Sequence, residues 1–278
     1  MTVKIEESGR RSVQVEVEVP GTPEEVWEAI ASGPGVSAWF VPTKIDGRVG
    51  GTIALEFGPG MEATAEILEW DPPRYLSAIG PPQAPGAPPF ATEWFVEARS
   101  GGVAVVRVVH SLFADTDEWD GQITGTESGW PAYFRVLRLY LEHFSGQGSA
   151  CIQPMAMTTE SAESAWAKAT EALGLGGAVV GERCETSGSA PRLGGTVEFA
   201  SDGGKYELVI RTDAPAPGVA QLLAMGCAEM GPGMTLVMMR LFLYGDGADE
   251  AIAGPAGEWQ AAIAGLFPPP APPTEHHE

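Results

Sequence analysis

The chain has 278 residues, 44% of them hydrophobic, and can therefore form two domain-sized cores. Its formal net charge is −21, from 16 basic and 37 acidic side chains, and such a surface repels phosphate backbones and anionic lipids. We therefore expect no nucleic-acid partner and no membrane partner. The three cysteines form no CxxC pair, which favours reduced thiols in a cytoplasmic protein.

The first predicted elements are a strand and a short helix. Residues 11–20 alternate valine with polar side chains and end in proline, which is typical of a half-buried strand. Thr22 is a good N-cap for the helix that follows, and Pro23 suits its first position. The glycines and proline at 33–35 should stop this helix, with room for one more turn over 36–40.

The next part of the chain reads as a run of strands. Alternation of apolar and polar residues predicts strands over 51–57, 61–70, 74–80, 91–98 and 103–110. Short turns join most of these strands, and a glycine pair separates the last two. A proline-rich stretch before the fourth strand can only be a loop. The order favours an antiparallel sheet over a doubly wound parallel one.

A long amphipathic helix is predicted over residues 127–144. Its apolar stripe has helical spacing and consists of Trp130, Phe134, Leu137, Leu141 and Phe144. The acidic stretch 115–120 just before it lacks the oxygen spacing of a calcium loop, so we expect a solvated loop there. So wide an apolar face should lie across the concave side of the sheet.

The second half of the chain repeats sequence features of the first half in the same order. Residues 161–177 resemble the first helix, and residues 192–200 resemble the strand that starts near residue 51. Trp166 and Trp259 stand where Trp27 and Trp130 stand in the first half, with a slightly shorter interval between them. The pattern indicates two tandem copies of one domain, the second one shortened.

Domain boundaries follow from this repeat. A Gly/Ser-rich break near residue 147 separates a first domain, 1–147, from a second, 148–267. The proline-rich tail, 268–278, is expected to be disordered.

Three motifs of the first half carry a family resemblance: EVEVPGTPEEVWEAI at 16–30, AWF at 38–40 followed by GRVGGTI, and SGW followed by YL in the long helix. With them the chain resembles the SRPBCC (START-like, Bet v 1-like) superfamily, and within it the activator of Hsp90 ATPase homologue 1-like (AHSA1-like) proteins. The resemblance covers residues 10–145 well and 158–267 weakly.

This resemblance implies an α+β helix-grip fold, in which a curved antiparallel sheet wraps around a long C-terminal helix. Such domains often leave a cavity between sheet and helix for an apolar ligand. Members of the superfamily bind lipids or hormones, cyclise polyketides or act as chaperone partners. The motifs specify the fold and not a reaction.

Strand alternation predicts which side chains face the space between sheet and helix. They are Trp39, Phe40, Leu55, Phe57, Ala65, Ile67, Trp94, Val106, Val108, His110, Tyr133, Phe134 and Leu137. They would form an apolar, aromatic ligand pocket. The same residues could equally fill an ordinary core, although small side chains such as Ala54, Ala63 and Ala104 favour open space.

His110 is the one titratable side chain that we place inward, and it is a candidate catalytic base. A core histidine with satisfied hydrogen bonds is the alternative. The sequence contains no Walker, GxSxG or HExxH motif, and we expect neither a cofactor nor a metal.

Three functions are consistent with the sequence. The first is binding of an apolar or aromatic small molecule in the N-terminal pocket. The second is a protein-interaction module, such as an Hsp90-activating co-chaperone, and the third is a cyclase- or hydrolase-like enzyme acting in the same pocket. A homodimer is a further expectation, because a shortened copy tends to expose apolar surface.

The second copy should have a smaller cavity or none, because methionines crowd it and methionine fills irregular gaps in cores. They are Met225, Met230, Met234, Met238 and Met239.

Overall fold

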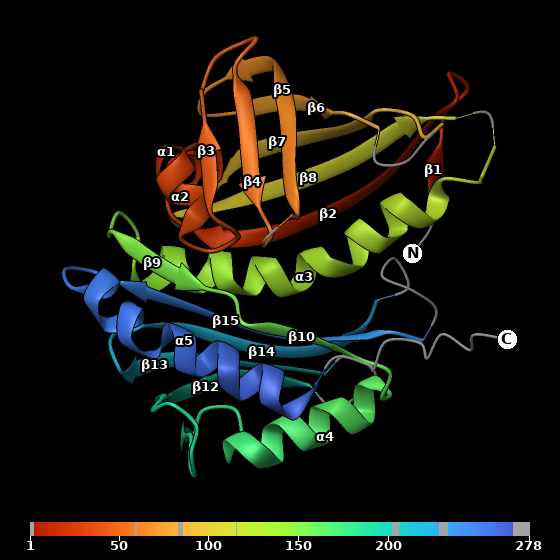
Figure 1. Cartoon of the computed structure of the whole chain (residues 1–278). Coiled ribbons are helices and arrows are strands. Elements are labelled where there is room, and N and C mark those ends of the chain that lie inside the picture. The colour runs from red at the N-terminus through yellow and green to blue at the C-terminus, as the bar shows by residue number, and fades with distance from the viewer. Residues whose placement is uncertain are drawn as a thin grey trace, which may run out of the picture. The chain divides into compact units, whose positions relative to one another are not determined.

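The computed structural model (Figure 1) describes residues 3–58, 60–82, 86–114, 116–201, 206–227 and 233–268, without the side chains of 122–124 and 126–128. The chain divides into two compact units, Met1–Gly148 and Ser149–Glu278. Met230 and residues 269–278 of the expected tail, including both tail histidines, lie outside the described residues.

Unit 1 is an eight-stranded antiparallel sheet with three helices. Its strands are β1 (Lys4–Ile5), β2 (Arg10–Pro20), β3 (Thr43–Ile45), β4 (Thr52–Glu56), β5 (Glu62–Asp71), β6 (Tyr75–Gly80), β7 (Phe90–Arg99) and β8 (Val103–Phe113). Its helices are α1 (Pro23–Ala31), α2 (Gly33–Ser37) and α3 (Asp120–His143).

The strand order in this sheet is β1-β2-β8-β7-β6-β5-β4-β3, so the long first strand pairs with the last one. All neighbours are antiparallel, and β7 and β8 are joined by a tight turn in which Gly101 and Gly102 both have positive φ. Figure 1 shows the sheet curving over α3, which runs beside β2. The predicted α+β helix-grip fold is therefore confirmed.

The start of α1 follows the predicted capping chemistry. The Thr22 hydroxyl accepts a hydrogen bond from the Glu25 amide at 3.3 Å, and the Glu25 carboxylate accepts one from the Thr22 amide at 2.8 Å. As predicted, α1 ends just before Gly33, and the glycines at 33 and 35 lie in the first turn of the short helix α2. A Cβ at Gly35 would lie 2.0 Å from the carbonyl oxygen of Glu28, so only glycine lets α2 approach α1 so closely.

Replacing Thr22 with alanine should lower the free energy of unfolding of unit 1 by about 1 kcal/mol, because the helix loses a capping acceptor. Thr22→Ser keeps the hydroxyl and should stay close to the wild type. Hydrogen exchange of unit 1 peptides measures both variants, because it reports on unit 1 alone. Equal losses in the two variants would show that the hydroxyl is not what stabilises the helix start.

Helix α3 is longer than the sequence predicts. The predicted stretch is one continuous helix, and its whole apolar stripe is buried. The helix, however, begins at Asp120, inside the stretch that we expected to be a loop. The guanidinium of Arg11, on β2, donates two hydrogen bonds to the Asp120 carboxylate and so lowers the pKa of this carboxyl group. This long-range ion pair anchors the first turn of α3 to the sheet.

Unit 2 has a similar plan, with a shorter last helix of 19 residues against 24 in unit 1. Its strands are β9 (Ser149–Ile152), β10 (Met155–Thr158), β11 (Arg183–Glu185), β12 (Gly194–Ser201), β13 (Tyr206–Ala214), β14 (Gly218–Gly226) and β15 (Thr235–Tyr244), and its helices are α4 (Ala162–Leu173) and α5 (Ala248–Leu266). The strand order is β10-β15-β14-β13-β12-β11, and β9 also pairs with β15.

The first strand again pairs with the last, but here it is broken. β9 and β10 both pair with β15, and Gln153 and Pro154 separate them. Proline lacks the N–H that a continuous strand would need, which explains the interruption. The repeat read from the sequence thus corresponds to a repeated topology.

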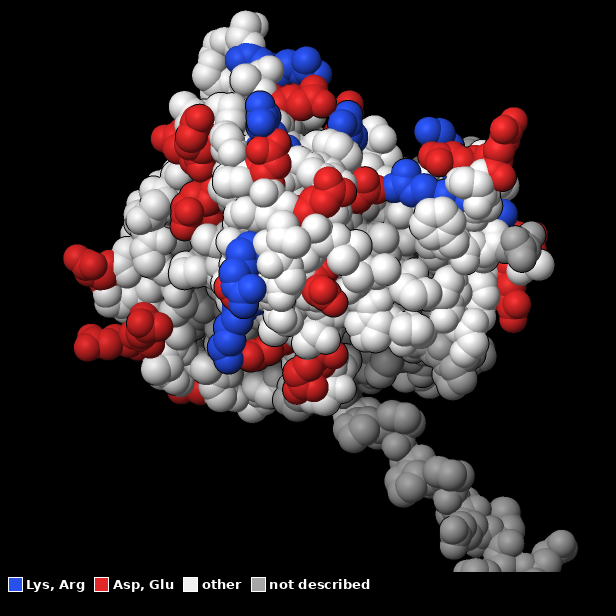
Figure 2. Space-filling model, turned by 90° about the horizontal axis from the view of Figure 1, so that it is seen from above, with Lys and Arg blue, Asp and Glu red and all other residues white. Residues whose placement is uncertain are grey.

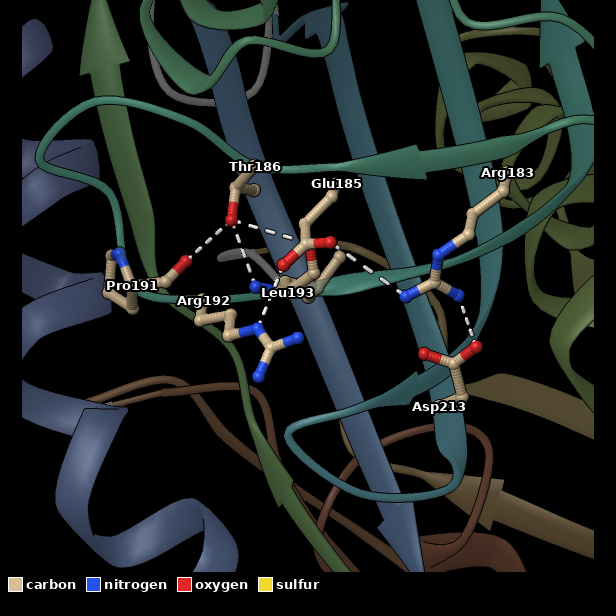
Figure 3. Close-up of polar contacts among 7 residues, drawn as sticks. All are labelled: Arg183, Glu185, Thr186, Pro191, Arg192, Leu193 and Asp213. Atoms are coloured by element: carbon tan, nitrogen blue, oxygen red, sulfur yellow. Dashed lines mark hydrogen bonds and ion pairs between the residues drawn. The ribbon is translucent and has the colours of Figure 1, made fainter.

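The edge strand β11 is held by polar contacts (Figure 3). The Thr186 hydroxyl donates to the Pro191 carbonyl at 2.8 Å and accepts from the Leu193 amide at 2.9 Å, closing the β11–β12 connection. Arg183 forms ion pairs with Asp213 and Glu185 on the exposed side of the strand. Exposed ion pairs of this kind contribute little free energy, so the Thr186 hydrogen bonds and the β-ladder hold this edge more than the ion pairs do.

The core of unit 2 is mainly aliphatic. Trp259 and Ile263 of α5 pack onto Leu222 and Leu241 of the sheet. Among the described members of the expected methionine group, Met239 is buried there, Met234 and Met238 are half-buried, and Met225 is exposed. A hollow in this core, next to Leu222 and Trp259, has a volume of only about 10 Å³, which agrees with the expected small cavity, although most of the described methionines are not fully buried.

Candidate functional site

An aromatic cluster occupies the inner side of the unit 1 sheet. Phe40, which follows α2, lies at its centre. The centroid of its ring is 4.5 Å from that of Tyr133, 5.5 Å from that of Trp130 and 5.6 Å from that of Phe57. The loop after α2, strand edge β4 and helix α3 thus meet at one ring.

The deep part of this cluster is closely packed. Trp94, on β7, contacts Trp130 edge-on with a centroid distance of 5.1 Å and approaches Trp39 at 6.4 Å. Trp39 is only 1% exposed, and its indole N–H donates to the Ala29 carbonyl at 2.9 Å. Rings that stack edge to face at these distances leave no room for a ligand between them.

The structure divides the predicted pocket residues into two groups. Those that are buried are Trp39, Phe40, Ile67, Trp94, Val106, Val108, His110, Phe134 and Leu137. Those that are partly exposed are Leu55, Phe57, Ala65 and Tyr133. The first group belongs to the core of unit 1, whereas the second group borders solvent.

Leu55 and Ala65 of the partly exposed group lie on one face of the neighbouring strands β4 and β5, whereas Phe57 follows β4 and Tyr133 is on α3. Ile53 and Ala65 are direct partners in the β4–β5 ladder, and so are Leu55 and Ala63. Ala63, which we expected to be covered, is exposed, because α3 packs mainly against β2, at the far side of the sheet order from β4. An apolar strip of the inner face therefore stays accessible next to Phe57.

His110 lies in the wall of the aromatic cluster with both ring nitrogens occupied. The Trp130 indole N–H donates to its Nε2 at 2.6 Å, so the proton of the neutral ring is on Nδ1, which lies 3.0 Å from the Thr92 hydroxyl. Phe90 stacks on the imidazole ring at a centroid distance of 5.0 Å. Burial lowers the pKa of His110 to about 3. The ring is a neutral structural hydrogen-bonding group, and its geometry does not favour the predicted catalytic base.

Sequence reasoning missed the partners of this histidine. Trp130 was assigned to the apolar stripe of the helix, and Thr92 and Phe90 were not singled out. Thr92 is the direct cross-strand neighbour of His110. The sequence alone does not give the register of β7 against β8, so it could not identify this pair. One sequence signal did point to a partner: a buried tryptophan N–H usually needs a hydrogen-bond acceptor, so Trp130 could be expected to have one.

The remaining reactive side chains form no centre. Among the residues that the structure describes, no three His, Cys, Asp or Glu side chains are grouped so that they could hold a metal ion. All three cysteines are free and half-buried, and burial raises the pKa of Cys151 to about 11. None of the described helices is long and apolar enough to cross a membrane. In the view of Figure 2, basic side chains lie scattered among acidic ones and form no broad basic patch.

Comparisons with known proteins agree with this architecture. Residues 20–142 match the model of the family described as Activator of Hsp90 ATPase homolog 1-like protein. No curated protein matches the chain.

Three solved structures illustrate the similarity. CalU16 from Micromonospora echinospora is 22% identical over 51% of this chain and 83% of its own, with a TM-score of 0.41. MLL2253 from Mesorhizobium loti is 22% identical over 49% of this chain and 99% of its own, with a TM-score of 0.43. The di-domain ARO/CYC BexL from the BE-7585A biosynthetic pathway is 14% identical over 92% of this chain and 94% of its own, with a TM-score of 0.44.

The matched segment starts at the end of β2 and stops one residue before the end of α3, so it covers α1, the strands that follow and nearly all of the long helix. Residues 20–142 of unit 1 are therefore an Activator of Hsp90 ATPase homolog 1-like domain.

Proposed function

We propose that unit 1 binds an apolar or aromatic small molecule between the inner face of its sheet and α3, at the accessible strip beside Phe57. The observation that carries this proposal is the partial exposure of Leu55, Phe57, Ala65 and Tyr133, which all border one apolar surface. An aromatic ligand could continue the ring stacking of Phe40 outward into this strip.

Apolar burial provides the driving force for such binding. Each Å² of apolar surface removed from water contributes about 25 cal/mol. A ligand that covered the strip would also protect side chains that the fold leaves half-exposed. Phe57, at one end of the strip, packs against Phe40 of the closely packed aromatic cluster, and such a preorganised neighbour limits the entropy lost on binding.

A neutral fluorescent probe, N-phenyl-1-naphthylamine, tests this proposal. Probe fluorescence should rise on binding to the wild type, and Leu55→Asp or Ala65→Trp should weaken binding about tenfold or more, by adding a charge or by filling the strip. Leu68→Asp is the matched control, because Leu68 is on the same strand as Ala65 and is exposed outside the cluster. Equal weakening in all three variants, or no binding to the wild type, would contradict the proposal.

A protein partner is a second candidate, favoured by the family match of residues 20–142. An Hsp90 ATPase assay with the purified chain distinguishes the two. Stimulation that survives Leu55→Asp would place the partner surface elsewhere than the strip. Catalysis in the pocket is less favoured, because Trp130 and Thr92 already occupy both nitrogens of His110.

A further inference from the structure

A separate hollow lies on the outer face of the unit 1 sheet. Its volume is about 330 Å³, within the usual range of small-molecule sites. It is lined by Lys4, Glu6, Arg10, Ser12, Val13, Gln14, Glu93, Phe95, Arg107 and Val109. Arg107 and Val109 alternate along β8 with Val106, Val108 and His110, which face the aromatic cluster. The hollow is therefore distinct from the strip described above.

The lining of this hollow has slightly more basic than acidic side chains, unlike the chain as a whole, and each of its three basic side chains forms an ion pair with a glutamate. Three basic side chains, Lys4, Arg10 and Arg107, line it, against the two acidic ones of Glu6 and Glu93. The whole chain has a formal net charge of −21 and only 16 basic residues. Positive charge gathered in a concave site attracts anions more strongly than the same charge spread over a convex surface.

Arg10 is held in place at one side of the hollow. It pairs with the Glu93 carboxylate, which also accepts a hydrogen bond from the Tyr75 hydroxyl at 3.1 Å. Glu6 approaches Arg10 only at 3.6 Å, as a looser ion pair. Glu93 therefore positions the guanidinium and is itself satisfied by two donors, and the side chain of Arg10 stays 25% exposed.

Arg107 is held over an aromatic floor. Its guanidinium lies 4.4 Å from the ring centroid of Phe95, its direct cross-strand partner, and its side chain is 27% exposed. Glu97 pairs with it at 3.3 Å from a half-exposed position. Phe95 in turn contacts the Tyr75 ring at 4.9 Å. A cation stacked in this way keeps N–H groups in its plane for an oxygen ligand.

We propose that this hollow binds a small aromatic oxyanion, a carboxylate or phosphate ester on a flat apolar ring. The oxyanion accepts hydrogen bonds from Arg10 and Arg107, with Lys4 at the rim, and the ring lies against Phe95 and Val109. Charge-assisted hydrogen bonds to guanidinium groups give the site its preference for anions. This proposal does not rest on the function proposed for the inner strip.

Titration of the full chain with benzoate and with phenyl phosphate, followed by amide chemical shifts, tests the proposal. Both anions should shift the amide resonances of Gln14, Phe95 and Val109. Added salt should weaken the binding of both anions. Benzyl alcohol, which lacks the charge, and inorganic phosphate, which lacks the ring, should each bind about tenfold more weakly. Arg107→Gln should raise the dissociation constant for benzoate about tenfold, the loss of one charge-assisted hydrogen bond.

Lys4→Gln is the second variant, because Lys4 is on a two-residue edge strand and its loss should leave the fold intact. It should raise the dissociation constant two- to threefold. Arg74→Gln is the matched control, since Arg74 pairs with Asp71 outside the hollow and should bind benzoate as the wild type does. The proposal is overturned if benzoate shifts Leu55 and Ala65 instead, if benzyl alcohol binds equally well, or if both hollow variants bind like the wild type.

Discussion

Replacing Trp39 with alanine is expected to lower the free energy of unfolding of unit 1 by about 3–5 kcal/mol. The side chain is 1% exposed, and its ring contacts Phe40 and Trp94 inside the aromatic cluster. Its removal leaves a large cavity among rings that cannot collapse easily, because sheet and helix hold them from several sides. It also leaves the buried carbonyl of Ala29 without its hydrogen-bond donor.

Two control variants separate these causes. Trp39→Phe keeps most of the ring but loses the N–H, and should cost about 1–2 kcal/mol. Trp70→Ala removes a tryptophan that is only half-buried against Trp27, and should cost less than Trp39→Ala. Hydrogen exchange of unit 1 peptides is the appropriate measurement, because a two-unit chain need not unfold in one step. A Trp39→Ala value within 1 kcal/mol of the wild type would contradict the packed cluster.

Local periodicity explains why most of the fold could be predicted. Alternation locates strands such as β2 and β8, because the face of a strand depends only on the order of its own residues. The capping residues at Thr22 likewise act within one helical turn. No distant contact has to be known to read these signals.

The elements that escaped prediction have no such local signal. β1 and β3 are two and three residues long, too short to show a period, and they exist because a longer strand pairs with them. The start of α3 contains Gly121 and Gly125, which have poor helix propensity, and it is anchored instead by Arg11 across the fold. Tertiary contacts override the local preference there.

The candidate site shows the same limit. Alternation predicts the direction of side chains but not their exposure: Val105 and Val109, on the opposite face of β8 from Val106 and Val108, are only 6% and 8% exposed. The curvature of the sheet and the path of α3 determine which inner residues are covered, and the alternation of residues along a strand predicts neither of them. The hydrogen-bond partners of buried side chains are equally hard to predict from the sequence. Trp130 has His110 as acceptor, whereas the buried indole N–H of Trp259 has no hydrogen-bond partner among the described residues.

The stability of unit 1 should fall as the pH drops below about 6.5, and His110 should be the main cause between pH 6.5 and pH 5. Burial lowers the pKa of His110 in the folded chain to about 3, against 6.5 for an ordinary histidine. Between these values the unfolded chain binds a proton that the folded chain excludes. Stability is therefore complete above pH 6.5 and falls by roughly 1.4 kcal/mol per pH unit below it, until the folded pKa is reached.

The variant His110→Gln isolates this effect. Glutamine can accept from the Trp130 N–H and donate to the Thr92 hydroxyl, but it does not titrate. Hydrogen exchange of unit 1 peptides at pH 7 and pH 5 should show a loss of stability about 2 kcal/mol larger in the wild type than in this variant. His143→Gln, at an exposed position, should keep the wild-type pH dependence. Carboxylates such as Asp120 add their own loss mainly at lower pH, because their pKa values lie lower. Equal slopes in wild type and His110→Gln would mean that the imidazole takes up a proton in the folded chain, and the neutral ring assigned to it would then be wrong.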